Sequence, residues 1–340
     1  MMKTKTKTHF EKYIELLRCP ACQSKLQNGG KKLKCIEAGH TFPIEKGIPE
    51  MFVPKEWQNG KLDVTDTVRQ FYEKTPFPNY DEFDSTAALV EKSRKGLFAR
   101  LLDEQVPLGS NVLEVGCGTG QLSNFLGIAQ RNMFGTDMCL NSLSLAEKFR
   151  SKNNIPHVGF YQMNLFRPIF APETFDLVIC NGVLMVTPDP LEGFKSIATL
   201  VKKGGYILIG LYNKYGRLTT DFRRLIFRFT GKRFLSLDPY LRERGGKLDA
   251  KTEAWFADQY QHPHECKHTM GQVLKWFDET GFRFVNSIPK GRFMQPFKDD
   301  EKLFVASPPA DRMTLAAVQT HMILTGNREG GFFTMIGQRM

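Results

Sequence analysis

The sequence predicts an α/β fold, in which a doubly wound and mostly parallel sheet carries helices on both faces. Between residues 111 and 201, apolar runs typical of buried strands alternate with segments whose apolar side chains recur at helical spacing. The first run, at residues 111–115, leads directly into glycines at positions 116, 118 and 120. Because right-handed crossovers bring the ends of parallel strands to one edge of the sheet, we expect a ligand site there, beside the glycines.

Length and composition indicate a globular protein with room for two or three units of ordinary domain size. The 340 residues are 41% hydrophobic, which is sufficient for a full core. No apolar run approaches the roughly eighteen residues of a membrane span, and the lysine-rich start at residues 1–8 lacks the apolar segment of a signal peptide. The expected compartment is therefore cytoplasmic. The seven cysteines are an odd number, which argues against a disulfide framework.

Positive charge is concentrated in two segments. The formal net charge is +11, yet residues 1–34 and residues 214–251 each contribute +7, so the remainder of the chain carries −3. Basic segments of this kind suit nucleic acid, an anionic lipid surface or an acidic small substrate, and they also occur as solvated faces.

The glycine turn has the properties of a site where a ligand approaches the backbone. Glycines at 116, 118 and 120 remove the Cβ atoms that would hold a ligand away, and they permit a sharp turn from strand to helix. The dinucleotide fingerprint places its third glycine one residue further on and cradles a pyrophosphate. Glu114, two residues before the first glycine, would repel phosphates and tolerate a cation, which favours a sulfonium ligand.

These residues resemble the first motif of the class I S-adenosylmethionine-dependent methyltransferases, an acid followed by three alternating glycines at the end of the first strand. The resemblance extends over about two thirds of the chain. It implies a Rossmann-like sheet of seven strands whose last strand is antiparallel. In the family, the acid matched by Asp137 binds the ribose hydroxyls, Met138 would flank the adenine, and Asn164 stands where an Asp often contacts the adenine amino group.

The implied cofactor-binding residues come from the strand ends and from one aromatic segment upstream of the first strand. In many relatives such a segment closes over the cofactor, and Tyr72 is the residue expected to do so; the alternative is that these aromatics only dock the linker onto the core. The expected set is Tyr72, Glu114, Gly116, Cys117, Gly118, Gly120, Asp137, Met138, Asn164, Leu165, Asn181 and Gly182.

The remaining elements are expected at defined positions. Later strands are expected at residues 175–182, 204–212 and 282–288, and the closing antiparallel strand at 330–337 rather than at the short run 303–306. Helices are expected over residues 89–105, 218–229, 270–279 and 313–324.

The N-terminal segment has the spacing of a closed structural zinc site. Cys19, Cys22, Cys35 and His40 form two knuckles, and Asn28 begins a glycine-rich hairpin tip between them. A segment this small can hardly fold on its own core, and metal would supply the missing stability. Residues 17–52 resemble the zinc ribbon of the small protein that activates eukaryotic tRNA and release-factor methyltransferases. The alternative is a ribbon that folds without zinc.

We therefore expect five segments. They are a zinc ribbon at 1–55, a linker with a lid helix at 56–106, the first part of the methyltransferase core at 107–213, a cap insertion at 214–268, and the last part of the core at 269–340 with an inserted loop at 289–329.

The cap insertion carries the candidate substrate and catalytic residues. Its first helix is expected to dock through Phe222, Leu225, Ile226 and Phe229, which leaves the arginines on its other side for the substrate. With Met185, the expected substrate contacts are Arg223, Arg224 and Arg228. The candidate bases are His262, His264 and, just before the insertion, Tyr212, and the alternative is that the reaction uses no base at all. The clustered histidines also allow a metal site or structural hydrogen bonding of a hinge.

The fourth motif, at residues 181–184, reads Asn-Gly-Val-Leu and lacks the Pro-Pro-aromatic signature of enzymes that methylate exocyclic nitrogens. It resembles the group that acts on small molecules, lipids and quinones or on carboxylates of modified tRNA bases, although Met185 and Val186 replace the histidine pair that often follows. The leading expectation is a small-molecule or lipid-linked acceptor. The alternatives are a tRNA or rRNA methyltransferase that grips RNA with its ribbon and basic cap, and a non-catalytic scaffold.

Overall fold

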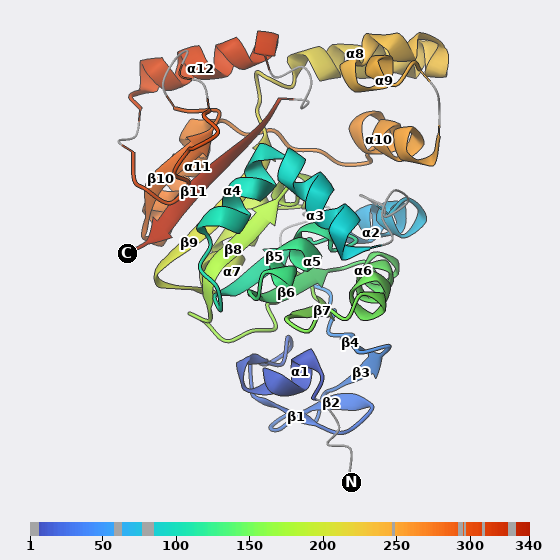
Figure 1. The fold of residues 1–340 in the computed structure, drawn as a ribbon, viewed down its shortest axis with the longest axis vertical. Coiled ribbons are helices and arrows are strands. Elements are labelled where there is room, and N and C mark those ends of the chain that lie inside the picture. Colours follow the sequence, from blue (N-terminus) through green and yellow to red (C-terminus); the bar gives the residue numbers. More distant parts are fainter. Residues whose placement is uncertain are drawn as a thin grey trace.

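The architecture was obtained as a computed structural model that describes residues 7–57, 63–76, 85–246, 249–291, 295, 297–307, 310–325 and 331–340. The long axis of the molecule runs from a small N-terminal sheet, through a large central sheet, to a group of helices formed by the cap and α12 (Figure 1). Among the described residues, no helix combines the length and the apolar character needed to cross a membrane.

The central sheet confirms the predicted fold. Its strands are β5 (Asn111–Val115), β6 (Asn132–Asp137), β7 (Val158–Gln162), β8 (Phe175–Asn181), β9 (Val201–Tyr212), β10 (Phe282–Ile288) and β11 (Phe332–Arg339). They lie in the order β10-β11-β9-β8-β5-β6-β7. Strands β5 to β9 pair in parallel, and β11 is antiparallel to both of its neighbours, β9 and β10.

Two hydrophobic layers bury the two faces of this sheet, and successive strand residues enter them alternately. In β5, Leu113 belongs to the layer that includes α7 (Pro190–Ala198), α11 (Met270–Thr280) and the ribbon. Val112 belongs to the opposite layer, with α3 (Thr86–Lys95), α4 (Leu97–Gln105), α5 (Gln121–Ile128) and α6 (Leu140–Lys152). Burial on both faces explains why the parallel strands are continuous apolar runs in the sequence.

Several predicted boundaries differ from the structure. The single helix expected at 89–105 is two helices, α3 and α4, because Gly96 adopts an extended conformation between them (φ −82°, ψ 115°). The fifth strand begins at Val201, before the predicted residue 204. The segment 303–306 is not a strand, and the closing strand is β11, although Gly330 of the predicted range lies outside the described residues.

The N-terminal ribbon is an antiparallel sheet of β1 (Leu26–Asn28), β2 (Lys32–Cys35), β3 (Thr41–Glu45) and β4 (Ile48–Pro49), preceded by α1 (His9–Lys12) and η1 (Ile14–Leu16). Backbone hydrogen bonds and a shared hydrophobic layer attach the ribbon to the core. The Arg18 N–H donates to the Ile169 carbonyl at 2.7 Å, and the Met51 N–H donates to the Gln162 carbonyl at 3.2 Å. Leu17 and Phe134 are buried in the same hydrophobic layer, so ribbon and core share one interior.

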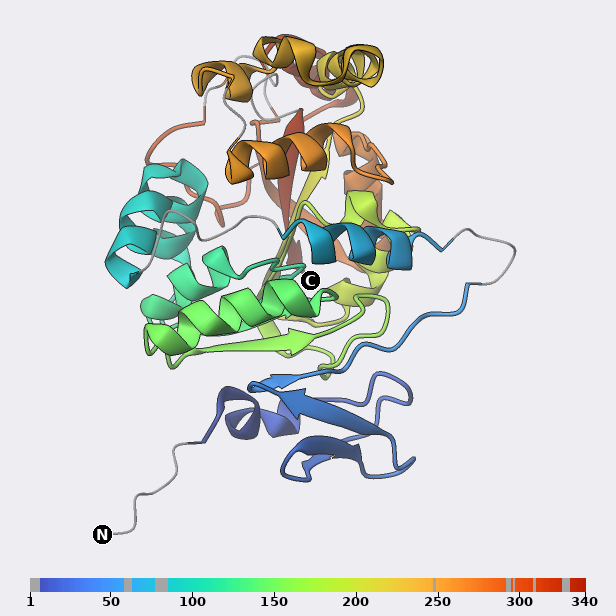
Figure 2. The same ribbon diagram turned by 90° about the vertical axis from the view of Figure 1, so that its right-hand side faces the viewer.

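The cap follows β9 and consists of α8 (Leu218–Thr230), η3 (Gly231–Leu237), α9 (Pro239–Glu243) and α10 (Ala250–Tyr260). The helix α10 lies between α8 and α2 (Thr65–Lys74), as both views show (Figures 1 and 2). A small core of its own holds the cap together, with Phe227, Phe256 and Tyr260 in contact.

The orientation of α8 is opposite to the one expected from its sequence. Phe222, Leu225 and Phe229 are 65%, 52% and 81% exposed, whereas Arg223 and Phe227 are buried. Arg223 is buried and Arg224 is partly buried because both find buried oxygen acceptors, described below, whereas Arg228 is exposed as expected. Local hydrophobicity therefore predicted the wrong docking face for this helix.

Candidate active site and zinc site

The turn after β5 requires glycine for both conformation and space. Gly116, Gly118 and Gly120 have φ values of +69°, +52° and +71°, which side-chain-bearing residues rarely adopt. A Cβ on Gly116 would lie 2.3 Å from Cγ2 of Val183, and one on Gly120 would lie 2.6 Å from the ring of Phe160. The turn thus brings bare backbone to the ends of the central strands.

Two carboxyl groups lie beside this turn. Asp137 accepts hydrogen bonds from the backbone N–H groups of Gly118 and Cys139, each at 2.9 Å. Burial raises the pKa of Asp137, and these N–H groups oppose the rise. Burial also raises the pKa of Glu114 to about 7, and the Ser123 hydroxyl, which donates to Glu114, opposes that shift. A cationic ligand near Glu114 would favour its ionised form.

A single cavity of about 720 Å³ opens at the turn and extends beneath the cap. Of the expected cofactor residues, all except Gly120 line it. Met185, Tyr212 and His262 line it as well, whereas Arg223, Arg224, Arg228 and His264 are not among its lining residues. Asn164 is buried, and its amide group donates to the Val53 carbonyl at 2.9 Å and accepts from the Phe166 N–H at 3.1 Å, so it also fastens the segment after the ribbon to the core.

The cavity ends, on the cap side, at a network that sequence reasoning missed. The Tyr72 hydroxyl donates to Asp258 Oδ1 at 2.9 Å, and the Gln259 amide donates to Asp258 Oδ2 at 3.0 Å and to the Tyr212 hydroxyl at 2.9 Å. Burial raises the pKa of Asp258 above its ordinary value and that of Tyr212 to about 12. One signal was present in the sequence: Trp255, Asp258, Gln259 and His262 follow helical spacing, and all four line the cavity.

The His262 ring is partly buried and uncharged at neutral pH. Burial lowers its pKa to about 4, so the ring is neutral. Its Nδ1 accepts the backbone N–H of His264 at 3.2 Å, which places the remaining proton on Nε2. That Nε2 is buried and has no partner among the described residues, so it is available to an oxygen of a ligand. His264 instead contacts the Thr187 carbonyl through its own Nε2 at 3.2 Å.

The three arginines expected to bind substrate do not line the cavity. Arg224 donates through Nη2 to the Gln259 carbonyl and to Glu265, each at 2.8 Å. Arg223 donates to the Thr220 hydroxyl at 3.0 Å from a buried site outside the main cavity, and Arg228 is exposed.

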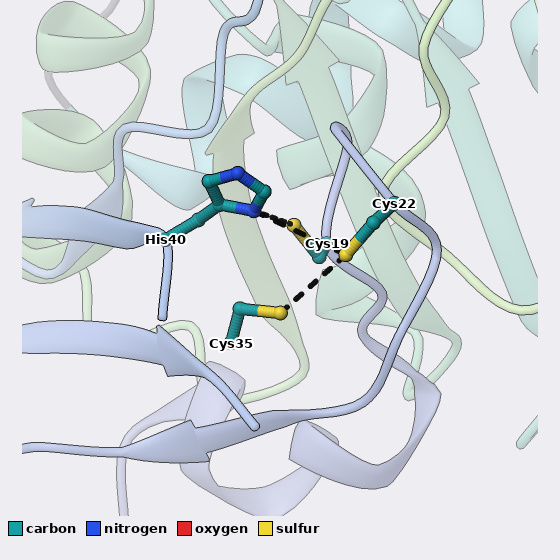
Figure 3. A group of neighbouring side chains, drawn as sticks. All are labelled: Cys19, Cys22, Cys35 and His40. Carbon is teal, nitrogen blue, oxygen red and sulfur yellow. Dashed lines mark hydrogen bonds between the residues drawn. The ribbon is translucent and has the colours of Figure 1, made fainter. Parts of the chain in front are cut away.

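The ribbon brings four metal-ligating side chains together, and Figure 3 shows them pointing toward one another. The ligand atoms of Cys19, Cys22, Cys35 and His40 all lie within 4.8 Å of one another. Cys19 Sγ is 3.4 Å from His40 Nδ1, and Cys22 Sγ is 3.5 Å from Cys35 Sγ. Tetrahedral zinc with bonds of about 2.3 Å separates its sulfur ligands by roughly 3.8 Å, so this cluster fits zinc with little adjustment.

Comparison with known proteins gives two family matches. Residues 88–287 match the model of a methyltransferase domain, and residues 11–47 match that of Trm112p-like proteins. Together with the Cys3His cluster, the second match assigns structural zinc to the ribbon.

Among curated relatives, an uncharacterized protein of Synechococcus, syc1184_c, is 26% identical over 58% of this chain and 51% of its own length. The ubiquinone biosynthesis O-methyltransferase of Albidiferax ferrireducens is 30% identical over 31% of this chain and 42% of the relative. That of Proteus mirabilis is 31% identical over 57% and 69%. The chain spans about half the length of the first curated relatives it matches.

The solved structure of PKMT2 from Rickettsia typhi has the same fold, with a TM-score of 0.52 at 16% identity over 73% of this chain and 54% of that one. The methyltransferase model covers more than half of the chain, and the glycine turn with Glu114 and Asp137 lies within the matched residues. The chain therefore belongs to the S-adenosylmethionine-dependent methyltransferases.

Proposed function

We propose that this enzyme methylates a hydroxyl oxygen of an apolar small-molecule or lipid-linked acceptor. The observation that carries the proposal is the composition of the cavity beneath the cap. Val186, Trp255 and Phe332 give it apolar walls, and its polar groups gather around Asp258. Such a pocket suits a largely apolar molecule with one or two oxygen substituents.

In this proposal the cofactor lies along the strand ends. Asp137 would hold the ribose hydroxyls, and Glu114 would lie near the positive charge. When bound, S-adenosylmethionine supplies a methyl group on a sulfonium, whose leaving thioether needs no activation. The protein then contributes alignment and the exclusion of water, and methyl transfer to a hydroxyl additionally requires a group that takes the hydroxyl proton.

Tyr72 and Asp258 are the groups proposed to take that proton. The Tyr72 hydroxyl already donates to Asp258, so it can accept the proton of an acceptor hydroxyl while it passes its own to the carboxylate. The raised pKa of Asp258 makes it a stronger base than an exposed aspartate. His262 would donate its Nε2 proton to a second oxygen of the acceptor and fix its orientation. Tyr212, with a pKa of about 12, stays protonated and helps to position Gln259.

The relatives named as ubiquinone biosynthesis O-methyltransferases support an oxygen acceptor on a quinone-type ring. The RNA alternative would need both basic segments on one track, but the ribbon and α8 lie at opposite ends of the long axis (Figure 1).

The test is incubation of the protein with methyl-labelled cofactor and either a cell lipid extract or total RNA. We expect label in the lipid extract. Label that is found only with RNA and is lost after ribonuclease treatment would replace this proposal with the RNA alternative.

A variant arm tests the proton acceptor. Asp258→Asn should lower kcat by about 10²- to 10⁴-fold, the usual range for loss of a general base. Its affinity for S-adenosylmethionine should remain unchanged. Asp278→Asn, on the exposed side of α11, is the matched control. An Asp258→Asn enzyme with undiminished kcat would remove Asp258 from the mechanism.

A further inference from the structure

The outer face of α8 carries a narrow apolar stripe. Leu218, Phe222, Leu225 and Phe229 follow at intervals of four, three and four residues, which places them along one line of the helix. They are 49%, 65%, 52% and 81% exposed. Since the opposite side of the helix buries Phe227 and Arg223, the stripe is not available to the core.

Further exposed apolar side chains lie on other elements at this end of the molecule. Phe234 and Leu237 of η3 are 51% and 45% exposed, and Met313 and Leu324 of α12 (Arg312–Thr325) are 84% and 75% exposed. Both views place α8, α9 and α12 at the same end of the molecule, away from the ribbon (Figures 1 and 2). Scattered exposed apolar residues are ordinary, but an aligned row of four on one helix face points to an interaction site.

Exposed cations outnumber exposed acids on the part of the cap that the structure describes. Among the cap residues that the structure describes, the exposed cations are Lys214, Arg228, Lys232, Arg233 and Arg242. The exposed acids are Glu243, Asp249 and Glu253, of which Glu253 pairs with Lys232 at 3.1 Å. A surface pocket of about 460 Å³ lies against the stripe, and it is lined by Leu218, Phe222 and Leu237 together with Arg223 and Arg242. Guanidinium groups at the edge of an apolar hollow suit a molecule that joins a phosphate to hydrocarbon.

We propose that α8, η3 and α12 form a docking face for an anionic lipid bilayer. In this arrangement α8 lies parallel to the membrane surface. Its four stripe residues enter the boundary between headgroups and acyl chains, and Arg228, Arg233 and Arg242 contact lipid phosphates. A one-sided apolar stripe flanked by cations is the pattern of interfacial helices, and anionic lipid attracts each nearby Lys or Arg.

This docking goes beyond the proposed acceptor chemistry and does not depend on it. Because α10 lies between α8 and the cavity wall formed by Tyr72, docking would bring the cavity close to the membrane surface, where a lipid-linked acceptor resides. Vesicle binding needs no acceptor, so it can succeed or fail independently of methyl transfer.

The experiment is flotation of the full chain with vesicles of phosphatidylcholine alone or with about one third phosphatidylglycerol. We expect flotation with the anionic vesicles that weakens as salt is raised. Phe222→Ser/Phe229→Ser should weaken binding at least about tenfold, because each phenylalanine loses its burial in the interface. Arg228→Glu/Arg233→Glu should do the same, because two attractive charges become repulsive.

Two matched controls separate the cap from other surfaces. Leu108→Ser/Val305→Ser removes apolar side chains that are 69% and 63% exposed outside the cap, and it should leave vesicle binding unchanged. Lys32→Glu/Lys34→Glu makes the same charge reversal in the ribbon. Circular dichroism and S-adenosylmethionine affinity establish that each variant is folded.

Three outcomes would overturn the proposal. They are no flotation of the parent with anionic vesicles, stronger loss in the ribbon variant than in the cap variants, and sedimentation of the parent as a dimer that Phe222→Ser/Phe229→Ser converts to a monomer. The last would assign the stripe to a second copy of the chain.

Discussion

Replacement of Glu265 by glutamine should loosen the cap, because this carboxylate neutralises two arginines. Arg217 donates to it through Nε at 3.1 Å and Nη2 at 2.7 Å, and Arg224 donates through Nη2 at 2.8 Å. The side chains of Glu265 and Arg217 are 4% and 0% exposed, so solvent cannot stabilise the arginine charge once the carboxylate is removed. Removing one partner of a buried ion pair costs about 3–5 kcal/mol.

The assay compares Glu265→Gln with Glu279→Gln in urea titrations and in hydrogen–deuterium exchange of α8 and α10. Glu279 pairs with Lys195 at 3.1 Å, and the two side chains are about half exposed, so its loss should cost less than about 1 kcal/mol. Exchange in the cap should accelerate only in Glu265→Gln. Equal stability of the two variants would refute the inference that Glu265 stabilises the cap by neutralising Arg217 and Arg224.

The pH dependence gives an independent arm of the same test. Burial by itself would raise the pKa of Glu265, but the hydrogen bonds and charges of Arg217 and Arg224 outweigh it and lower the pKa below the ordinary value. A depressed carboxyl pKa contributes stability above the unfolded value of about 4.3. This contribution is lost as pH falls through the folded pKa. The advantage of the parent over Glu265→Gln should therefore be full at neutral pH and shrink below about pH 4.

Three further predictions concern the cofactor turn and the ribbon. Gly116→Ala should abolish measurable S-adenosylmethionine binding in calorimetry, because the new Cβ would clash with the Val183 side chain. The control is Gly109→Ala, at a position with a φ of +74° and open space around it; it should cost only about 1–2 kcal/mol of stability and leave binding intact. Affinity for S-adenosylmethionine should rise with pH across about 7 as Glu114 ionises, and Glu114→Gln should flatten that rise; an unchanged slope would place the sulfonium elsewhere. Metal analysis should find one zinc per chain, and Cys22→Ser should lower that content and expose the ribbon to protease, whereas a metal-free ribbon with full protection would contradict the zinc assignment.

The predictions from sequence succeeded where short-range patterns determine the structure. The turn at Gly116 depends on a few consecutive residues, and the alternation of strands and helices depends on windows of about ten. The zinc ligands likewise form two local knuckles. These local patterns were sufficient to predict the family, the sheet and the location of the cavity.

The features that sequence missed depend on contacts between distant residues. Asp258 meets Tyr72 across 186 positions, and Arg224 meets Glu265 across 41. Hydropathy alone predicts that the phenylalanines of a helix face the core and that its arginines face solvent. It carries no information about a buried carboxylate that is distant in the sequence and pairs with those arginines. The break between α3 and α4 was missed for a smaller reason, since an isolated Gly96 is also tolerated within helices.

The buried charges of the cap and its exposed apolar stripe are two consequences of one helix orientation. If α8 turned its stripe inward, Arg224 would leave Glu265, and the buried pair of Glu265 and Arg217 would lose one of its partners. The observed orientation satisfies these charges, but it leaves two phenylalanines and two leucines half or more exposed, so that each forgoes a part of the about 1.5–3 kcal/mol that full burial contributes. A membrane surface would recover part of that free energy without disturbing Glu265. Glu265→Gln should accordingly weaken vesicle binding as well as cap stability, because both depend on the direction in which α8 presents its apolar side.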